Sequence, residues 1–135
     1  MDQKKLVQAA FAAREQAYVP YSGFAVGAAL LCADGSVYTG CNVESASYPA
    51  TICAERTAFV KAVSEGKREF TAIAVAGAPE AETPHAICPP CGVCRQVLRE
   101  FAPNMEVICL NGAGEDQVFT LPELLPHSFG PEYLA

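Results

Sequence analysis

The sequence predicts an α/β domain in which helices cover both faces of a mixed five-stranded sheet, a three-layer α/β/α arrangement. Apolar runs typical of strands alternate with helical patterns along most of the chain. Residues 71–78 form a continuous apolar run, as expected for a strand covered on both faces. Only residues 111–116 separate the last two expected strands, which is too short for a parallel crossover. Those two strands should therefore be antiparallel.

The first part of the chain is expected to hold one helix and a β-hairpin. Asp2 can cap a helix that Pro20 stops. Small apolar residues recur in it at the spacing of one helical face: Leu6, Ala10, Ala13 and Ala17. Residues 24–32 and 37–43 are β-prone, and the Asp-Gly turn between them is a hairpin signal.

Two further helices and three further strands are expected in the rest of the chain. Residues 53–64 read as a helix with Gly66 just past its end, and residues 91–102 as a helix that Pro103 ends. Their apolar residues lie at helical spacing: Ala58, Phe59 and Val63 in the first, and Val93, Val97, Leu98 and Phe101 in the second. The remaining strands are expected at residues 71–78, 106–110 and 117–121.

Length and charge limit the class of protein. The 135 residues suit one domain over residues 1–135, and 51% hydrophobic residues suffice for a core without disulfides. The net charge is −6, and lysines and arginines form no run. Because nucleic-acid backbones are bound by clustered cations, these features indicate a small-molecule substrate and no nucleic-acid partner.

The cysteine content indicates a reducing compartment and a metal. The N-terminal segment is broken by charges, unlike a signal peptide, and no stretch reaches transmembrane length. We therefore expect a cytoplasmic protein without a membrane partner, in which thiols stay reduced. Seven cysteines are an odd number that suits a disulfide framework poorly. Three of them lie within expected strands and are interpreted as buried apolar residues: Cys32, Cys41 and Cys109.

Three other cysteines have the pattern of a metal site. Cys91 and Cys94 form a CxxC unit at the start of an expected helix, where residues three apart share a face. Cys53 opens another expected helix in the same way. Helix N-termini favour thiolates, so two of them meeting at one point would suit tetrahedral zinc. Three protein ligands leave a fourth position for water, as in catalytic zinc sites.

Two other interpretations of these cysteines remain open at this stage. The CxxC unit alone could be a redox pair, which would leave Cys53 unused. Cys88, which precedes Cys91 through two prolines, could instead close a structural four-cysteine site.

Charged residues beside Cys53 supply the remaining chemistry. Glu55 can take a proton from water at the metal and deliver it to a substrate, although a carboxylate in a first helical turn is often idle. Three thiolates give a zinc site excess negative charge. Arg56 can offset it by donating hydrogen bonds to a thiolate, or can simply be a solvated surface arginine.

Four sequence motifs together resemble those of the cytidine deaminases of the small homotetrameric class. The motifs are FAVGAALL at residues 24–31, GCNVES at 40–45, TICAER at 51–56 and PPCGVCRQVL at 89–98. The resemblance runs from Tyr21 to Phe129 and departs from the usual pattern at two points. Ala25 stands where the family usually has Pro, and Pro89 where it often has Ser.

The resemblance implies the fold of that family and its zinc-dependent hydrolase reaction. Cytidine and 2′-deoxycytidine would be deaminated to uridine and 2′-deoxyuridine with release of ammonia, in pyrimidine salvage. One Zn²⁺ per subunit would be held by Cys53, Cys91 and Cys94. Glu55 would protonate the ring nitrogen and then carry a proton to the leaving amine.

The resemblance also implies substrate-binding residues. Asn42 and Glu44 match the pair that binds the ribose 3′-hydroxyl, and Phe24 matches the aromatic residue against the cytosine ring. Tyr48, with the backbone around Ala46, and the C-terminal Phe129 match segments that reach the site of a neighbouring subunit. Without the resemblance, these would be ordinary turn, core and tail residues. A homotetramer with shared active sites is therefore expected.

Two rival functions remain to be weighed. One is a deaminase of another aminopyrimidine nucleoside, such as blasticidin S, which the pair Asn42 and Glu44 disfavours. The other is a noncatalytic zinc-stabilised module. Deaminases of nucleic acids and nucleotides usually carry His at the place of Cys53 and run their last two strands parallel, with an intervening helix. The short connection at residues 111–116 and the acidic charge balance both oppose that interpretation. The sequence does not fix the preference between ribose and deoxyribose, the tolerance of modified cytosines or the role of Cys88.

Overall fold

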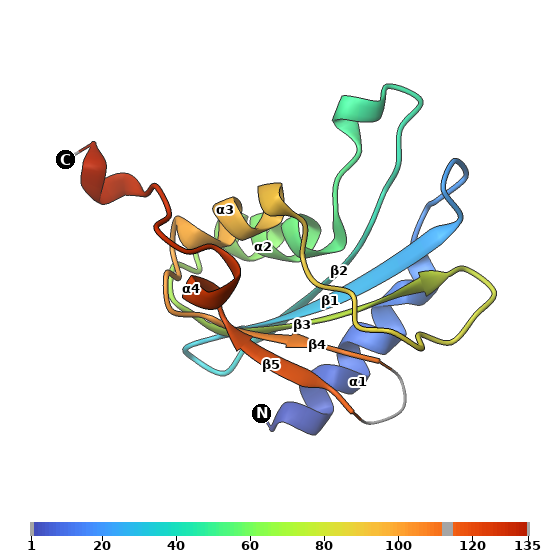
Figure 1. The fold of residues 1–135 in the computed structure, drawn as a ribbon, viewed down its shortest axis with the longest axis horizontal. Helices are drawn as coiled ribbons and strands as arrows, with labels where there is room; N and C mark the ends of the chain where they lie inside the picture. Colours follow the sequence, from blue (N-terminus) through green and yellow to red (C-terminus); the bar gives the residue numbers. More distant parts are fainter. Residues whose placement is uncertain (1, 112–114, 135) are drawn as a thin grey trace.

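The computed structural model describes residues 2–111 and 115–134. Its strands form one mixed sheet in the order β2-β1-β3-β4-β5 (Figure 1). Their bounds are β1 (Phe24–Cys32), β2 (Val37–Cys41), β3 (Phe70–Pro79), β4 (Glu106–Cys109) and β5 (Gln117–Thr120). Strand β1 is antiparallel to β2 and β3, whereas β3 and β4 are parallel. The antiparallel pair β4–β5 confirms the expected hairpin, although residues 112–114 of its connection lie outside the described residues.

Helices cover both faces of the sheet, which confirms the three-layer prediction. Helix α1 (Gln3–Ala13) lies on one face, and α2 (Ala54–Ser64) and α3 (Gly92–Arg99) lie on the other (Figure 1). Because side chains alternate along a strand, β1 contributes Leu30 to the core under α2 and α3, and Ala29 to the core under α1. The central strand β3 is buried on both faces. None of the described helices has the length and apolar character needed to cross a bilayer.

Two elements end earlier than their sequence patterns indicate. Helix α1 stops at Ala13 and a 3₁₀ turn, η1 (Arg14–Gln16), follows, so Ala17 lies outside the helix. The reason is a tertiary hydrogen bond, because the N–H of Tyr18 donates to the carbonyl of Asn42 at 3.0 Å. Strand β2 ends at Cys41, and Val43 forms bridges with Tyr18 and Ile52 instead.

The third long helix and the last strand are also shorter than expected. Helix α3 ends at Arg99, and its final turn tightens, as the N–H of Phe101 bonds to the carbonyl of Leu98. Within α3, Leu98 is buried whereas Val93 is exposed. Leu121 does not end β5 but opens a short helix, α4 (Leu121–Leu124), that the apolar pattern did not indicate.

Two 3₁₀ turns complete the fold. One, η2 (Tyr48–Ala50), precedes α2, and the other, η3 (Pro131–Tyr133), lies near the C-terminus. Beyond α4 the chain runs past the C-terminal end of α3 and projects from the body of the molecule (Figure 1).

Candidate active site

Three thiols meet where two helices begin. Cys53 is the N-cap residue of α2, Cys91 is the N-cap residue of α3, and Cys94 lies in the first turn of α3. Their Sγ atoms all lie within 4.8 Å of one another, and those of Cys53 and Cys91 are 3.7 Å apart. Neither N-cap residue makes a side-chain cap hydrogen bond, so both thiols remain available for another partner.

Local packing holds these helix starts in place. A Cβ atom on Gly40 of β2 would lie 2.5 Å from the Ala54 carbonyl oxygen and from the Ala58 nitrogen. Glycine at this position therefore lets the first turn of α2 lie directly against the strand. At the other helix, Arg95 Nε donates to the Pro90 carbonyl at 2.7 Å, which fixes the chain just before Cys91.

The donor set fits zinc. Two thiolate ligands of a tetrahedral zinc ion, each about 2.3 Å from the metal, lie about 3.8 Å apart. The spacing of 3.7 Å between Cys53 and Cys91 matches that value. Among the described residues the cluster has three members, which leaves a fourth coordination position for a non-protein ligand.

Cys88 lies near the cluster but is not part of it. A Cβ atom on Gly77 would meet the Cys88 Sγ at 2.7 Å and the Phe24 ring at 2.9 Å, so the thiol packs between β3 and that ring. Burial raises the pKa of Cys88 to about 11, and the charge of Glu55 adds to the shift. Among the described residues the cluster comprises Cys53, Cys91 and Cys94 without Cys88, so the geometry does not support the four-cysteine interpretation.

One thiolate of the cluster, that of Cys53, is stabilised even without a metal, whereas the hydrogen bond to Cys53 raises the pKa of Cys94. A hydrogen bond from Cys94 lowers the pKa of Cys53 to about 5, and Arg56 contributes to the same shift. Arg56 Nη2 lies 3.8 Å from the Cys53 Sγ and 3.3 Å from the Thr51 carbonyl oxygen. Its Nε is buried with no acceptor among the described residues. Leaving such a donor unpaired costs about 1–3 kcal/mol, which attraction to the thiolate can offset.

A buried carboxylic acid lies beside the thiols. Glu55, in the first turn of α2, is 4% exposed. It is the one charged residue that is buried among the described residues. Burial raises its pKa to about 7, and the charge of Cys53 acts in the same direction. A carboxyl group with a pKa near neutrality can both accept and donate a proton at physiological pH. The arrangement thus provides a proton carrier next to a metal-binding cluster.

Asn42 and Glu44 lie at the edge of this region, bonded to the start of β1. Asn42 Oδ1 accepts from the Val26 N–H, and its Nδ2 donates to the Phe24 carbonyl, both at 2.9 Å. Glu44 accepts from the N–H of Tyr21 at 3.0 Å and from the N–H and hydroxyl of Ser22 at 3.1 and 2.5 Å. The Ser22 hydroxyl is the main reason that the pKa of Glu44 is lowered.

The other candidate substrate residues are spread over the surface. Phe24 is partly exposed next to Cys88, and Tyr48 is 72% exposed with its ring 5.9 Å from that of Tyr21. Tyr48 and Glu44 line one hollow, and Ala46 is exposed on the loop between them. Phe129 lies elsewhere, because its carbonyl accepts from Gln96 on the outer side of α3. A single chain therefore does not bring Phe129 to the other residues.

The structure adds supporting residues that the sequence motifs did not single out. Ser22 bonds Glu44 and also accepts from the Phe24 N–H at 3.0 Å. Thr51 accepts from the Ser45 N–H through its hydroxyl and from Arg56 through its carbonyl. Arg95 donates hydrogen bonds to the carbonyls of Pro90 and Leu124. Only the position of Ser22 and Thr51 within or beside the motifs could have indicated them.

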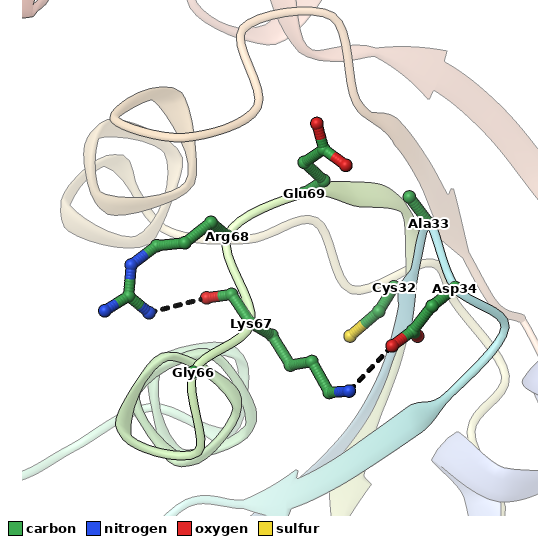
Figure 2. Close-up of a pocket in the computed structure, with 7 residues that line it drawn as sticks. All are labelled: Cys32, Ala33, Asp34, Gly66, Lys67, Arg68 and Glu69. Atoms are coloured by element: carbon green, nitrogen blue, oxygen red, sulfur yellow. Dashed lines mark hydrogen bonds and ion pairs between the residues drawn. The ribbon is translucent and has the colours of Figure 1, made fainter.

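A separate hollow lies at the far ends of β1 and α2 (Figure 2). It is lined by Cys32, Ala33, Asp34, Gly66, Lys67, Arg68 and Glu69. Lys67 donates to Asp34 at 2.6 Å, and Arg68 donates to the Val63 and Lys67 carbonyls at 2.8 Å. The two cations of this hollow, Lys67 and Arg68, thus already have partners within the chain. The hollow lies at the end of β1, whose nine residues span about 30 Å, so it is far from the start of that strand. The candidate catalytic groups are instead the three thiols and Glu55 at the starts of α2 and α3.

Together these features define a class. Thiolate ligands at helix starts, an open coordination position and a buried carboxylic acid are the parts of a zinc-dependent hydrolase. Residues 1–110 match the family described as "Cytidine and deoxycytidylate deaminase zinc-binding region".

Comparison with individual proteins gives the same assignment. The cytidine deaminase of Sporosarcina psychrophila is 51% identical over 136 residues, which covers 100% of this chain and 96% of that protein. The crystal structure of cytidine deaminase from Burkholderia pseudomallei superposes with a TM-score of 0.87 at 51% identity, over 96% of this chain and 100% of that one. The blasticidin-S deaminase of Bacillus cereus is 31% identical over 75% of this chain and 74% of that protein. The chain belongs to the cytidine deaminase family, whose matching region binds zinc, and its cysteine cluster is able to hold a metal ion.

Proposed function

We propose that this chain hydrolyses cytidine and 2′-deoxycytidine to uridine and 2′-deoxyuridine with release of ammonia. The observation that carries the proposal is the buried Glu55 next to the thiols of Cys53, Cys91 and Cys94. Membership of the cytidine deaminase family supports the same substrate class. One Zn²⁺ per chain would be held by the three cysteines.

Bound zinc supplies an activated water in this class of reaction. Glu55 would accept a proton from the attacking water and deliver it to the ring nitrogen next to the amine-bearing carbon. It then carries the second proton to the amine, which leaves as ammonia while the water oxygen stays on the carbon. Arg56 offsets the charge of the Cys53 thiolate, since its guanidinium lies 3.8 Å from the Sγ.

The nucleoside is bound by residues at the start of β1 and after β2. Phe24 would pack against the cytosine ring. Asn42 and Glu44 would bind the ribose 3′-hydroxyl, since each retains hydrogen-bonding capacity after its internal bonds. Asn42 uses one of its two N–H donors, and the three bonds to Glu44 leave one of about four acceptor sites.

The remaining proposals concern the assembly and its setting. We place the active sites of a homotetramer between subunits, with Tyr48, Ala46 and Phe129 reaching a neighbour. Support comes from the exposure of these residues. A single catalytic domain over residues 1–135, acting in pyrimidine salvage in the cytoplasm, suits the reduced thiols of the site.

A turnover panel tests this function. Purified protein of known zinc content is incubated with cytidine, deoxycytidine, cytosine, deoxycytidine monophosphate and blasticidin S, and deamination is followed by ultraviolet absorbance. We expect rapid turnover of the two nucleosides alone. Faster turnover of blasticidin S would assign the chain to that rival activity, and no turnover of any compound by zinc-loaded protein would favour a noncatalytic zinc module.

A further inference from the structure

The segment after α4 is held to helix α3 by two side chains of that helix, Arg99 and Gln96. We name this segment, residues 125–134, the C-terminal arm. Arg99 Nε donates to the Ser128 hydroxyl at 2.8 Å, and its Nη2 pairs with the Glu132 carboxylate. The Arg99 side chain is only 12% exposed, so the arm largely covers it. One guanidinium therefore joins two points of the arm that lie four residues apart.

Gly130 provides the space for this contact. A Cβ atom at that position would overlap the Arg99 guanidinium and the Glu132 carboxylate. Its φ of −156° is extended backbone that any residue can adopt, so a larger residue here would be opposed only by the ends of the Arg99 and Glu132 side chains, which would have to shift. Gly130 is buried although the arm around it is largely exposed. The guanidinium thus packs directly on the arm backbone between its two hydrogen-bonding partners.

A second side chain of α3 holds the part of the arm that carries its aromatic rings. Gln96 Nε2 donates to the Phe129 carbonyl at 2.9 Å. The Phe129 ring stacks on the Tyr133 ring with centroids 5.3 Å apart and planes inclined by 15°. The two residues are nevertheless 56% and 66% exposed, so the stacked pair faces outward. An ordered aromatic pair is thereby presented at the surface of the chain.

The arm is anchored away from the cysteine cluster of its own chain. Arg99 ends α3 whereas Cys91 caps its start, and eight helical residues span about 12 Å. The arm projects beyond the C-terminal end of that helix (Figure 1). The ion pair of the arm therefore lies at the opposite end of α3 from Cys91, and its two rings are exposed.

We propose that Arg99, together with Gly130 and Glu132, is a positioning residue that holds the arm ready to present Phe129 to the substrate site of a neighbouring subunit. This inference rests on the proposed function, in which Phe129 completes that site. Without the contacts of Arg99, the arm would have to be ordered each time a nucleoside binds. The entropy lost in that ordering would weaken binding. The contacts of Arg99 with the arm should therefore affect KM more than kcat.

Steady-state kinetics of the full-length protein test the inference. We expect Arg99→Gln to raise KM for cytidine roughly tenfold, with kcat changed less than about threefold, because only preorganisation is lost. Glu132→Gln and Gly130→Ala should move KM in the same direction by smaller factors. The matched control is Arg68→Gln, since Arg68 donates only to backbone carbonyls at the far end of α2. A KM for Arg99→Gln equal to that of the control would overturn the proposal.

A double variant distinguishes positioning from general damage. If Arg99 acts through Phe129, the combination Arg99→Gln/Phe129→Ala should have the KM of Phe129→Ala alone. Multiplied effects of the two changes would overturn the proposal. Chymotrypsin gives a readout independent of activity, since it should cleave after Phe129 and Tyr133 faster in Arg99→Gln than in wild type or the control. Equal cleavage rates would show that Arg99 does not order the arm.

The two hypotheses fail in different ways. A wild-type protein that does not deaminate cytidine would refute the proposed function, whatever the proteolysis shows. Normal kinetics for Phe129→Ala in an active enzyme would refute the role of the arm while leaving the deaminase intact. Faster proteolysis of Arg99→Gln without a change in KM would show that Arg99 orders the arm but does not affect substrate binding. That result would refute this inference and leave the proposed function intact.

Discussion

The charge of the thiol cluster is offset by a single guanidinium. Arg56 lies beside Cys53 and is the charged partner that favours its thiolate. We expect Arg56→Gln to weaken zinc binding or kcat/KM by about 10–100-fold, the usual effect of removing a hydrogen bond to a metal ligand. Competition with a chromophoric chelator measures the affinity. Arg68→Gln is the control, and equal zinc affinity and activity in the two variants would contradict this role.

In the proposed function Glu44 contacts the ribose and not the base, so its loss should affect only substrates that carry a ribose. Loss of a hydrogen bond to a charged group costs about 1.5–3 kcal/mol, so Glu44→Gln should raise KM for cytidine roughly 10–100-fold. The slow reaction of free cytosine, which has no ribose, should change less than about twofold. Glu69→Gln, an exposed carboxylate in the distant hollow, is the matched control. A parallel loss with cytosine would show that Glu44 acts through the fold of the segment that holds Ser22.

The cysteines of the proposed metal site were more predictable than the acid beside them. Cys91 and Cys94 share a helical face by their spacing, and helix starts favour the thiolates, so the cluster followed from local rules. The burial of Glu55 did not, because it depends on how α2 and α3 pack against each other. The separation of Cys88 from the cluster likewise depends on the space that Gly77 leaves beside β3.

At the scale of elements, the contact between β2 and α2 positions two site residues. A methyl group on Gly40 would press on the backbone of α2 at Ala54 and Ala58, and neither atom can turn away as a side chain would. We expect Gly40→Ala to lower the free energy of unfolding by about 1–3 kcal/mol. Because the start of α2 would shift with Cys53 and Glu55, zinc affinity should fall as well.

Urea unfolding and chelator competition measure these two effects of Gly40→Ala. Gly92→Ala is the control for stability, since a Cβ atom at Gly92 meets nothing within 4 Å. An unfolding free energy for Gly40→Ala no lower than that of Gly92→Ala would show that β2 and α2 can separate without cost.

Element bounds were predictable where local patterns decide them. The β-prone run at residues 24–32 became β1 with those bounds, and Gly66 ends α2 with a φ of +97°. Helix α4 was missed because Leu121 continues an apolar run from β5. Its start was nevertheless marked, since Thr120 and Glu123 form a capping box around Pro122. The early end of α1 had no local signal, as a tertiary bond at Tyr18 sets it.

At the scale of the molecule, active sites shared between subunits would allow two differently inactivated chains to restore activity in one assembly. Phe129→Ala keeps the cysteine cluster but lacks the arm ring, whereas Glu55→Gln keeps the arm but lacks the proton carrier. We expect hetero-oligomers of the two variants to deaminate low cytidine concentrations faster than either parent, because some sites combine an intact Glu55 with an intact arm. The particle mass should be near four chains of 14.3 kDa.

Co-expression with two affinity tags yields the hetero-oligomers for this assay. Activity equal to the average of the parents would place Phe129 in the site of its own chain. A fully active monomer would remove the basis for shared sites altogether.

The course of the C-terminal arm lay beyond sequence-based prediction. The polar partners Arg99, Ser128 and Glu132 have no spacing that marks them as neighbours, because they meet only after α3 and α4 have packed. The layered sheet, by contrast, followed from the alternation of helical and strand patterns.

The central claim is that Glu55 moves protons beside a zinc ion held by three cysteines. Its most direct test is the rate of uridine formation from cytidine by wild type and Glu55→Gln, with zinc content measured on the same samples. We expect one zinc per chain in both proteins and a kcat lower by about 10²–10⁴-fold in the variant. Full activity of zinc-loaded Glu55→Gln would contradict the account.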